Sequence, residues 1–240
     1  MNTVYDKSIE LYGDGIGKVE YIDHMGTDLT IVNSARVSFG KTKDELDERD
    51  KKLIRYLVDH KHTSTFEHNV VTFRFVVPLF VRSQHHRHRT WSYNEISRRY
   101  TDENLAFYEP QEFRTQHKSN RQASNVEDLI NPMVPVPYNN AGFQGDASAV
   151  MKDWNQKAVK FYNDLMEAGV CREQARGVLP QNLYTEYYGT VSLLNALKFI
   201  DLRTHEGAQV EIQKVAYAML EILEDLYPVA VKAYRENRGL

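Results

Sequence analysis

Arginine and histidine are concentrated in one short segment of this sequence, SQHHRHRTWSYNEISRRY, which spans residues 83–100. The segment holds five consecutive Arg or His residues, two further arginines, three aromatic residues and a single acid, Glu95. Guanidinium groups bind phosphates, imidazoles bind metals, and arginines beside aromatic rings suit stacked bases. Three kinds of site are therefore possible: a metal site, a single-stranded nucleic-acid surface, and a pocket for a phosphorylated small molecule.

The clustering of histidine is the argument for a metal. Six of the nine histidines lie between His60 and His88. However, the sequence contains no H-E-x-x-H pattern, and catalytic zinc sites need histidine or carboxylate ligands at definite spacings. His88 also lies between Arg87 and Arg89, whose positive charges would oppose a nearby dication. We therefore expect no metal site.

A single-stranded nucleic-acid-binding module built on residues 82–100 is the main alternative function. Its arginines are interleaved with Trp91, Tyr93 and Tyr100, an arrangement that suits the stacking of bases. The basic run is nevertheless confined to one segment, and Glu95 lies inside it. A carboxylate among arginines is better explained by a ligand that carries both a sugar hydroxyl and a phosphate. The pattern favours a compact phosphate-and-sugar pocket, without a nucleic-acid partner.

The composition is that of an ordinary globular protein, with 42% hydrophobic and 26% charged residues in a chain of 240. A net charge of -3 argues against binding nucleic acid or an anionic membrane through the overall field. The single cysteine, Cys171, fits a reducing compartment. No apolar run approaches the roughly 20 residues that span a bilayer, and the N-terminal segment lacks the apolar core of a signal peptide. We expect a cytoplasmic protein with no membrane partner.

Hydrophobic periodicity predicts the elements of the first part of the chain. Residues 18–29 read as a short strand that closes in a turn, and a helix follows from about Asp28. Thr42 and Glu45 form a T-x-x-E capping box, which predicts a helix that reaches His60.

The basic segment directly follows a predicted strand. Pro78 ends the strand but suits the first turn of a helix, which we expect to run through Arg82 towards Arg87. The strand is predicted because apolar residues alternate over residues 69–77 and would form one face: Val71, Phe73, Phe75 and Val77.

The middle of the chain, from Glu109 to Asp146, contains four of the seven prolines. We expect it to be a long loop with little regular structure, mobile or acting as a lid. The segments on either side look like parts of one core, so a single domain over residues 1–240 is expected. After the loop, the pattern predicts a helix, a strand and two helices: residues 148–169, 183–192, 193–202 and 208–227.

The basic segment resembles the signature of the flavin-dependent thymidylate synthases, R-H-R followed by seven residues and a serine, here Arg87 to Arg89 and Ser97. The longer form of that signature, R-H-R-x-x-S-x-N-E-x-S-x-R-Y, is also matched. Further blocks agree in order: NSARVSFG, HTSTFEH, ARGVLPQNLYTEYYGTVS and FIDLRTHEGAQVEIQ. Together they cover most of the chain outside about 109–146, where we expect relatives to vary in length.

The resemblance implies both a fold and a reaction. The fold is α/β in the α+β sense, a mostly antiparallel sheet with flanking helices and no Rossmann loop. The reaction converts dUMP to dTMP, with methylenetetrahydrofolate as carbon donor, reduced FAD as hydride carrier and NADPH as reductant. The active sites of such enzymes are shared between the subunits of a homotetramer. Since the sequence has no G-x-G-x-x-G, side chains are expected to hold the FAD phosphates.

The resemblance also implies roles for individual residues. Arg203 is expected to polarise the uracil ring, and His62 to act near folate and flavin. Expected to bind the cofactor are Ser38, Ser64, Arg87, His88, Arg89, Glu95, Ser192 and Lys198. Expected to bind dUMP, with Glu95 on the ribose and Ser97 and Arg99 near the phosphate, are Gln84, His85, His86, Arg87, Glu95, Ile96, Ser97, Arg98, Arg99, Arg176 and Arg203.

Several of these residues could instead have purely structural roles. Ser38 could cap a helix, Gln84 could face solvent, and His62 could interact with a helix C-terminus. Arg176 and Arg203 could form surface ion pairs. Cys171 is expected to be a small buried hydrophobic residue and not a nucleophile.

The chain also departs from the family pattern. Ser192 and Lys198 stand where relatives often have asparagine, and Leu194 where they have arginine. Gly207 stands where many have histidine, with His205 displaced. We expect the adenine end of the flavin to be held differently.

Overall fold

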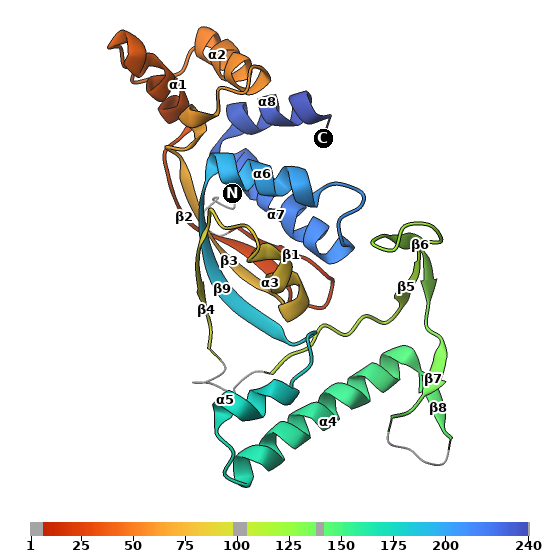
Figure 1. Cartoon of the computed structure of the whole chain (residues 1–240). Helices are drawn as coiled ribbons and strands as arrows, with labels where there is room; N and C mark the ends of the chain where they lie inside the picture. Colours follow the sequence, from red (N-terminus) through yellow and green to blue (C-terminus); the bar gives the residue numbers. More distant parts are fainter. Residues whose placement is uncertain (1–6, 98–104, 138–141, 240) are drawn as a thin grey trace.

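The computed structural model describes residues 7–97, 105–137 and 142–239 (Figure 1). Its centre is a five-stranded antiparallel sheet with the strand order β1-β2-β3-β9-β4. The expected α+β fold with a mostly antiparallel sheet is therefore confirmed. The strands are β1 Ser8–Glu10, β2 Lys18–Met25, β3 Val70–Pro78, β4 Ser92–Glu95 and β9 Tyr184–Ser192.

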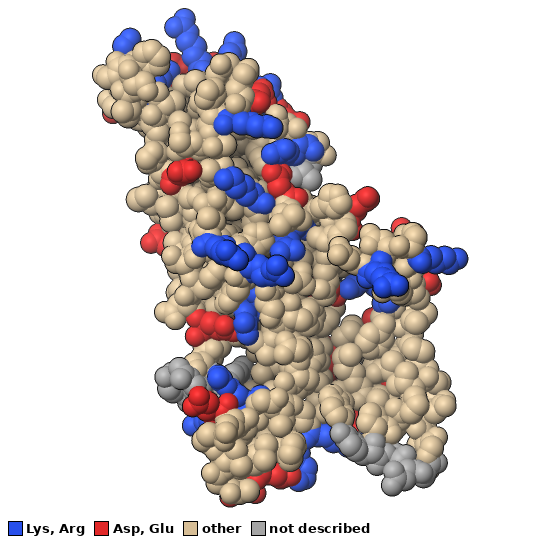
Figure 2. All heavy atoms as spheres, viewed as in Figure 1, with Lys and Arg blue, Asp and Glu red and all other residues tan. Residues whose placement is uncertain are grey.

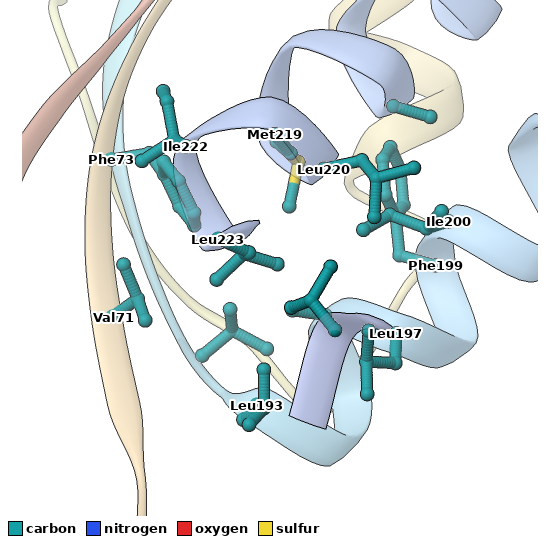
Figure 3. Close-up of a cluster of buried hydrophobic side chains, with 14 of the residues drawn as sticks. Val71, Phe73, Leu193, Leu197, Phe199, Ile200, Met219, Leu220, Ile222 and Leu223 are labelled. Carbon is teal, nitrogen blue, oxygen red and sulfur yellow. The ribbon is translucent and has the colours of Figure 1, made fainter. Parts of the chain in front are cut away.

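Three helices cover one face of this sheet: α3 Leu79–His85, α6 Leu193–Arg203 and α7 Val210–Leu226 (Figure 1). The predicted alternation in β3 is confirmed, because Val71, Phe73, Phe75 and Val77 are all fully buried. Truncating a buried phenylalanine of this kind to alanine typically costs about 3–5 kcal/mol. Figure 3 shows Val71 and Phe73 beside apolar side chains of α6 and α7, among them Leu193, Leu197, Phe199, Met219 and Leu223.

A second group of helices lies at one end of the sheet (Figure 1). It consists of α1 Asp28–Arg36, the 3-10 turn η2 Val37–Phe39, α2 Glu48–Asp59, the 3-10 turn η3 Thr63–Phe66 and α8 Pro228–Arg238.

The predicted start of α2 was wrong, because the capping residue is Asp47 and not Thr42. The Asp47 carboxylate accepts hydrogen bonds from the backbone N–H groups of Arg49 and Asp50. Asp50 completes the box by accepting from the Asp47 backbone N–H. Aspartate caps a helix as well as threonine does. Asp50 is fully buried and also forms ion pairs with Arg36 and Lys43. These ion pairs further stabilise the start of α2 at this position.

The segment from Glu109 to Asp146 is not the irregular loop that its prolines suggested. It contains two antiparallel hairpins, of which Pro132 immediately precedes the second and Pro135 ends its first strand. Short exposed strands of this kind tolerate proline, because no further strand needs its missing N–H. The four strands are β5 Phe113–Gln116, β6 Ser124–Ile130, β7 Met133–Pro135 and β8 Gln144–Asp146.

The chain returns to the sheet through α4 Ala147–Glu167, α5 Arg172–Ala175 and the 3-10 turn η4 Arg176–Val178. The four elements predicted after the middle segment are thus present, α4, β9, α6 and α7. Cys171, expected to be buried, is exposed at the start of α5. Within the described ranges, no helix is both long and apolar enough to cross a membrane.

Candidate active site

The basic segment forms the end of α3, a turn and the edge strand β4. Tyr93 of β4 fixes this turn, because its hydroxyl donates to the backbone carbonyls of His85 and His88 at 3.0 and 3.2 Å. The last carbonyls of a helix have no partner within the helix, so this one side chain stabilises the end of α3. Arg87 and Arg89 are exposed on the turn. Lys and Arg side chains gather over the region of α3 and α6 (Figure 2).

His85 was expected to bind substrate, but its side chain belongs to the core. It is fully buried, and its Nδ1 lies 2.7 Å from the hydroxyl of Tyr187. Its ring packs against Phe75, Trp91 and Phe199. Burial first, and then the neighbouring charges of His88, His86 and Arg203, hold the pKa of His85 well below its ordinary value. His85 is therefore a neutral, buried imidazole that supports the site by packing.

His86 is half-buried against Tyr93, with 4.2 Å between the ring centroids. Burial also lowers the pKa of His86. Its Nε2 is buried and has no hydrogen-bond partner among the described atoms. An unpaired buried nitrogen of this kind costs free energy unless a ligand or water satisfies it. His85 Nε2 is likewise without a partner among the described atoms, but His85 is fully buried, whereas His86 is only half-buried and can reach a ligand.

Arg203, at the last turn of α6, reaches back to the turn after α3. Its Nε donates to His88 Nε2 at 3.2 Å, and its Nη2 donates to the backbone carbonyl of Gln84 at 3.3 Å. Burial and the adjacent Arg203 charge lower the pKa of His88 to about 4. His88 is therefore neutral near pH 7 and can accept the hydrogen bond. Arg203 makes no ion pair with any acid in the described ranges, so it is not a surface ion-pair residue.

A polar cavity of about 580 Å³ lies at the end of β4 and the start of β9. Glu95 is its central acid: Glu95 Oε1 accepts from the Thr185 hydroxyl at 2.6 Å and lies 3.3 Å from Arg82 Nε. The Arg82 contact is an ion pair without hydrogen-bond geometry, so Arg82 Nε is still without a hydrogen-bond partner among the described atoms. Four residues expected to bind dUMP line this one cavity: Glu95, Ile96, Ser97 and Arg176.

A second, largely apolar cavity of about 250 Å³ lies between α2, η3, α6 and α8. Leu57, Phe66 and Leu197 are among its apolar residues, and its cations are Lys61, Lys198 and Arg238. Thr63, which also lines it, lies between His62 and Ser64 in the sequence. Apolar walls with lysine and arginine fit an aromatic ring that carries phosphates, which is what a flavin dinucleotide presents.

Of the residues expected to hold the cofactor, six line neither cavity, among them Ser38 and Ser192. Ser38 is exposed in η2 and makes no helix-capping hydrogen bond. Ser192 caps α6, where its hydroxyl accepts from the backbone N–H of Asn195 at 3.4 Å and from its side chain at 3.1 Å. Arg98 and Arg99, expected to bind dUMP, lie outside the described residues.

Two residues that complete the site are not distinguished by the sequence alone. Arg82 stands out there only as part of the basic segment, and Thr185 only as part of a matching block. Both contact Glu95. Thr185 has no distinctive signal of its own, because the same strand also carries Glu186, Thr190 and Ser192.

The fold and the two cavities define an α+β protein with a polar cavity at the start of β9 and an apolar cavity beyond its end, beside α6 and α8. Residues 20–229 match the family model described as Thy1, thymidylate synthase complementing protein. The flavin-dependent thymidylate synthase of Thermus thermophilus is 42% identical over 221 residues, which cover 92% of this chain and 76% of the relative. That of Kosmotoga olearia is 38% identical over 91% of this chain and 90% of the relative.

The solved structures agree with these relatives. The UMP/dUMP methylase PolB of Streptomyces cacaoi, bound with 5-Br dUMP, has a TM-score of 0.75 and 31% sequence identity, covering 95% of this chain and 97% of that one. The chain belongs to the flavin-dependent thymidylate synthase family, and the resemblance of its basic segment to that family's signature is confirmed.

Proposed function

We propose that this protein methylates dUMP to dTMP, with methylenetetrahydrofolate as carbon donor, FAD as cofactor and NADPH as reductant. The observation that carries the proposal is the polar cavity, where signature residues from β4 meet Arg176 of η4. A volume of about 580 Å³ is within the usual range for small-ligand sites. The likeness to a methylase that holds a dUMP analogue supports the same occupant here.

The cavity residues divide between the sugar and the phosphate. The Glu95 carboxylate accepts hydrogen bonds only, which suits a ribose hydroxyl. Thr185 and Arg82 both contact Oε1 of that carboxylate and hold it in place. Ser97 and Arg176 bind the phosphate, and Arg99 joins them. Arg176 makes no ion pair with an acid among the described residues, and its Nε donates only to the carbonyl of Glu173 at 3.3 Å. Its guanidinium therefore remains available to an anion.

Arg203 stabilises the negative charge that develops on the uracil ring. The protein offers no thiolate at the site, so the ring must become electron-rich without a covalent bond to cysteine. A guanidinium stays protonated and offers a planar set of donors to a carbonyl edge. With Nε bound to His88 and Nη2 to the Gln84 carbonyl, Arg203 keeps Nη1 without a partner in the described chain.

The cofactor is held by side chains in place of a glycine-rich loop. When bound, reduced FAD supplies the hydride. Arg87, His88 and Arg89 contact it from the turn after α3. Lys198 contacts it at the apolar cavity, and Ser64 contacts it from η3, next to Thr63 of that cavity. His62, next to that cavity, acts near the folate and flavin. Ser38 and Ser192 contribute from neighbouring subunits.

We further propose a homotetramer with shared active sites. Ser38 is flanked by Val37 and Phe39, whose side chains are 71% and 77% exposed. Apolar side chains this exposed are typical of interaction surfaces. The sheet face opposite α3, α6 and α7 also carries exposed Ile22 and Tyr188. The single cysteine fits work in the cytoplasm.

The test is to purify the protein, record its absorption spectrum and mass in solution, and assay dTMP formation by chromatography. We expect a yellow tetramer that forms dTMP only when dUMP, methylenetetrahydrofolate and NADPH are all present. A monomer with stoichiometric flavin would contradict the shared sites. A colourless protein with salt-sensitive binding to single-stranded DNA would favour the nucleic-acid alternative instead.

A further inference from the structure

A buried acid that the proposed reaction does not use lies at the start of α7. Glu211 is only 4% exposed. Its Oε1 accepts from Arg114 Nη2 at 2.7 Å and from the Tyr108 hydroxyl at 3.1 Å. Its Oε2 accepts from Gln209 Nε2 at 2.9 Å. The carboxylate is therefore saturated with donors, and those donors come from three separate segments of the chain.

Gln209 connects this acid to the proposed active site. While its Nε2 donates to Glu211, its Oε1 accepts from Gln84 Nε2 at 2.5 Å. Gln84 is also the residue whose backbone carbonyl accepts from Arg203. A continuous line of hydrogen bonds thus runs from Arg114 of β5 through Glu211, Gln209 and Gln84.

The charge on Glu211 sets the direction of every bond in this line. Burial by itself would raise the pKa of Glu211, but the hydrogen bond and charge of Arg114 outweigh it and hold the pKa below its ordinary value. An ionised carboxylate only accepts. Gln209 must then turn its NH2 group to Glu211 and its oxygen to Gln84. Gln84 must in turn use its NH2 group towards Gln209.

In this arrangement, the amide oxygen of Gln84 remains free to accept a hydrogen bond. Gln84 Oε1 makes no hydrogen bond with another residue of the described ranges. Uracil has an N–H donor at N3, whereas cytosine has an acceptor at the same position. If the Gln84 oxygen faces the base, it pairs with N3–H of uracil but opposes the N3 acceptor of cytosine. It therefore favours uracil, because an unpaired donor or acceptor in a closed site weakens binding about 10- to 100-fold.

We propose that Glu211 is a positioning residue that fixes the Gln84 amide, through Gln209, so that its oxygen faces the pyrimidine and selects uracil over cytosine. The inference rests on the proposed function, since it assumes that Gln84 contacts the base of dUMP. Arg114 extends this role to β5, so the first hairpin of the middle segment supports the selectivity of the site.

Glu211→Gln tests this with almost no change in shape. Arg114 and Tyr108 are donors, so the new amide must turn its oxygen to them and its NH2 group to Gln209. Gln209 and Gln84 then reverse, and Gln84 presents NH2 to the base. We expect dUMP binding to weaken about 10- to 100-fold while dCMP binding is unchanged or stronger. Calorimetric titration of both nucleotides measures the ratio directly.

The matched control is Glu221→Gln on the exposed side of the same helix, which should leave the ratio unchanged. An equal loss of both nucleotides in Glu211→Gln, or an unchanged ratio, would overturn the proposal, because a merely structural role lowers both affinities together. Wild-type protein that binds no dUMP would instead refute the proposed function.

Arg114→Met provides a second test should Glu211→Gln fail to fold. The groups that face Glu211 are Arg114, Tyr108 and Tyr12, with Glu112 in the adjoining cavity. Without Arg114, burial raises the Glu211 pKa, so the carboxyl becomes protonated as the pH falls. dUMP and dCMP carry the same phosphate, which itself titrates at about pH 6, so the ratio of their affinities is measured. We expect the ratio in Arg114→Met to be close to wild type at pH 8 and to shift towards dCMP as the pH falls, while the wild-type ratio stays level. A pH-independent ratio in Arg114→Met would contradict the inference.

Discussion

The guanidinium of Arg203 donates from Nε to Nε2 of His88 across 3.2 Å, which joins the end of α6 to the turn after α3. The contact requires a neutral imidazole with its proton on Nδ1. The Arg203 charge itself disfavours protonation of His88, whose pKa is lowered to about 4 by burial and by this charge. The Arg203 charge thus favours neutral His88, and neutral His88 accepts the hydrogen bond that orients Arg203.

Arg203→Ala and Arg203→Lys should both retain the fold and flavin but lose most dTMP formation. Removal of one preorganised donor typically costs about two orders of magnitude in rate, and lysine lacks the planar donor geometry. Single-turnover dTMP formation measures the loss, with flavin reduction by NADPH as an internal control. Arg235→Lys, in an ion pair on α8, should behave as wild type. Turnover by Arg203→Ala near the wild-type rate would rule out the assigned role.

His88 should contribute to the pH dependence of stability. Its folded pKa of about 4 lies below its ordinary value of 6.5, so the unfolded chain binds the proton more readily. The stability it contributes is present above about pH 6.5 and is lost as the pH falls towards 4. Urea unfolding at pH 4.5, 5.5 and 7 should therefore show a shallower dependence of stability on pH in His88→Gln than in wild type. Exposed His68→Gln is the control, and an equal dependence in all three proteins would contradict the prediction.

Ser97 should bind dUMP and not attack it. It lines the polar cavity with Arg176, where a hydroxyl can donate to a phosphate. A hydrogen bond to a charged group is worth about 1.5–3 kcal/mol, so Ser97→Ala should raise KM for dUMP about 10- to 100-fold and leave kcat within a few-fold. Ser92→Ala, exposed on β4, should change neither value. Mass spectrometry that found a nucleotide bound covalently to Ser97 would disprove this assignment.

Cys171→Ala should keep turnover within about 2-fold of wild type, as is usual for exposed substitutions. Cys171 is exposed and does not line the cavity that holds Glu95 and Ser97. Alkylation of the wild-type thiol, followed by the dTMP assay, checks the same point without mutation. Complete loss of activity in both experiments, with flavin and fold intact, would assign Cys171 a catalytic role after all.

The sequence predicted the sheet and its main helices well, because their signals are local. The alternation in β3 and the periodicity of α7 each arise within one element, and tertiary contacts only reinforce them. The start of α2 was missed because Asp47 competes successfully with Thr42 as the cap, and because Arg36 and Lys43, which pair with Asp50 of the same capping box, act from outside the helix. The hairpins after Glu109 were missed because proline argues against strands in general, whereas short exposed strands accommodate it.

The sequence named several residues that the structure brings together, but it did not show how their side chains are arranged. The signature named Glu95, Ser97 and Arg203, but the sequence alone could not separate His85, which is fully buried, from His86, which is half-buried. His85 and His86 are adjacent and of the same type, and they differ only in the direction in which the backbone at the end of α3 points each side chain. Gln209 and Glu211 carry no local signal, because their importance depends on contacts more than 90 residues away in sequence.

Strand β9 passes into helix α6 without a loop, since Ser192 is both the last strand residue and the helix cap. Thr185 near one end donates to Glu95, and Arg203 at the other end donates to His88 and to the Gln84 carbonyl. An inserted residue would move a strand side chain to the opposite face or rotate a helical one by about 100°. Insertions and deletions should therefore be excluded from Thr185 to Arg203, whereas the hairpins between β4 and α4 can change in length without disturbing this spacing.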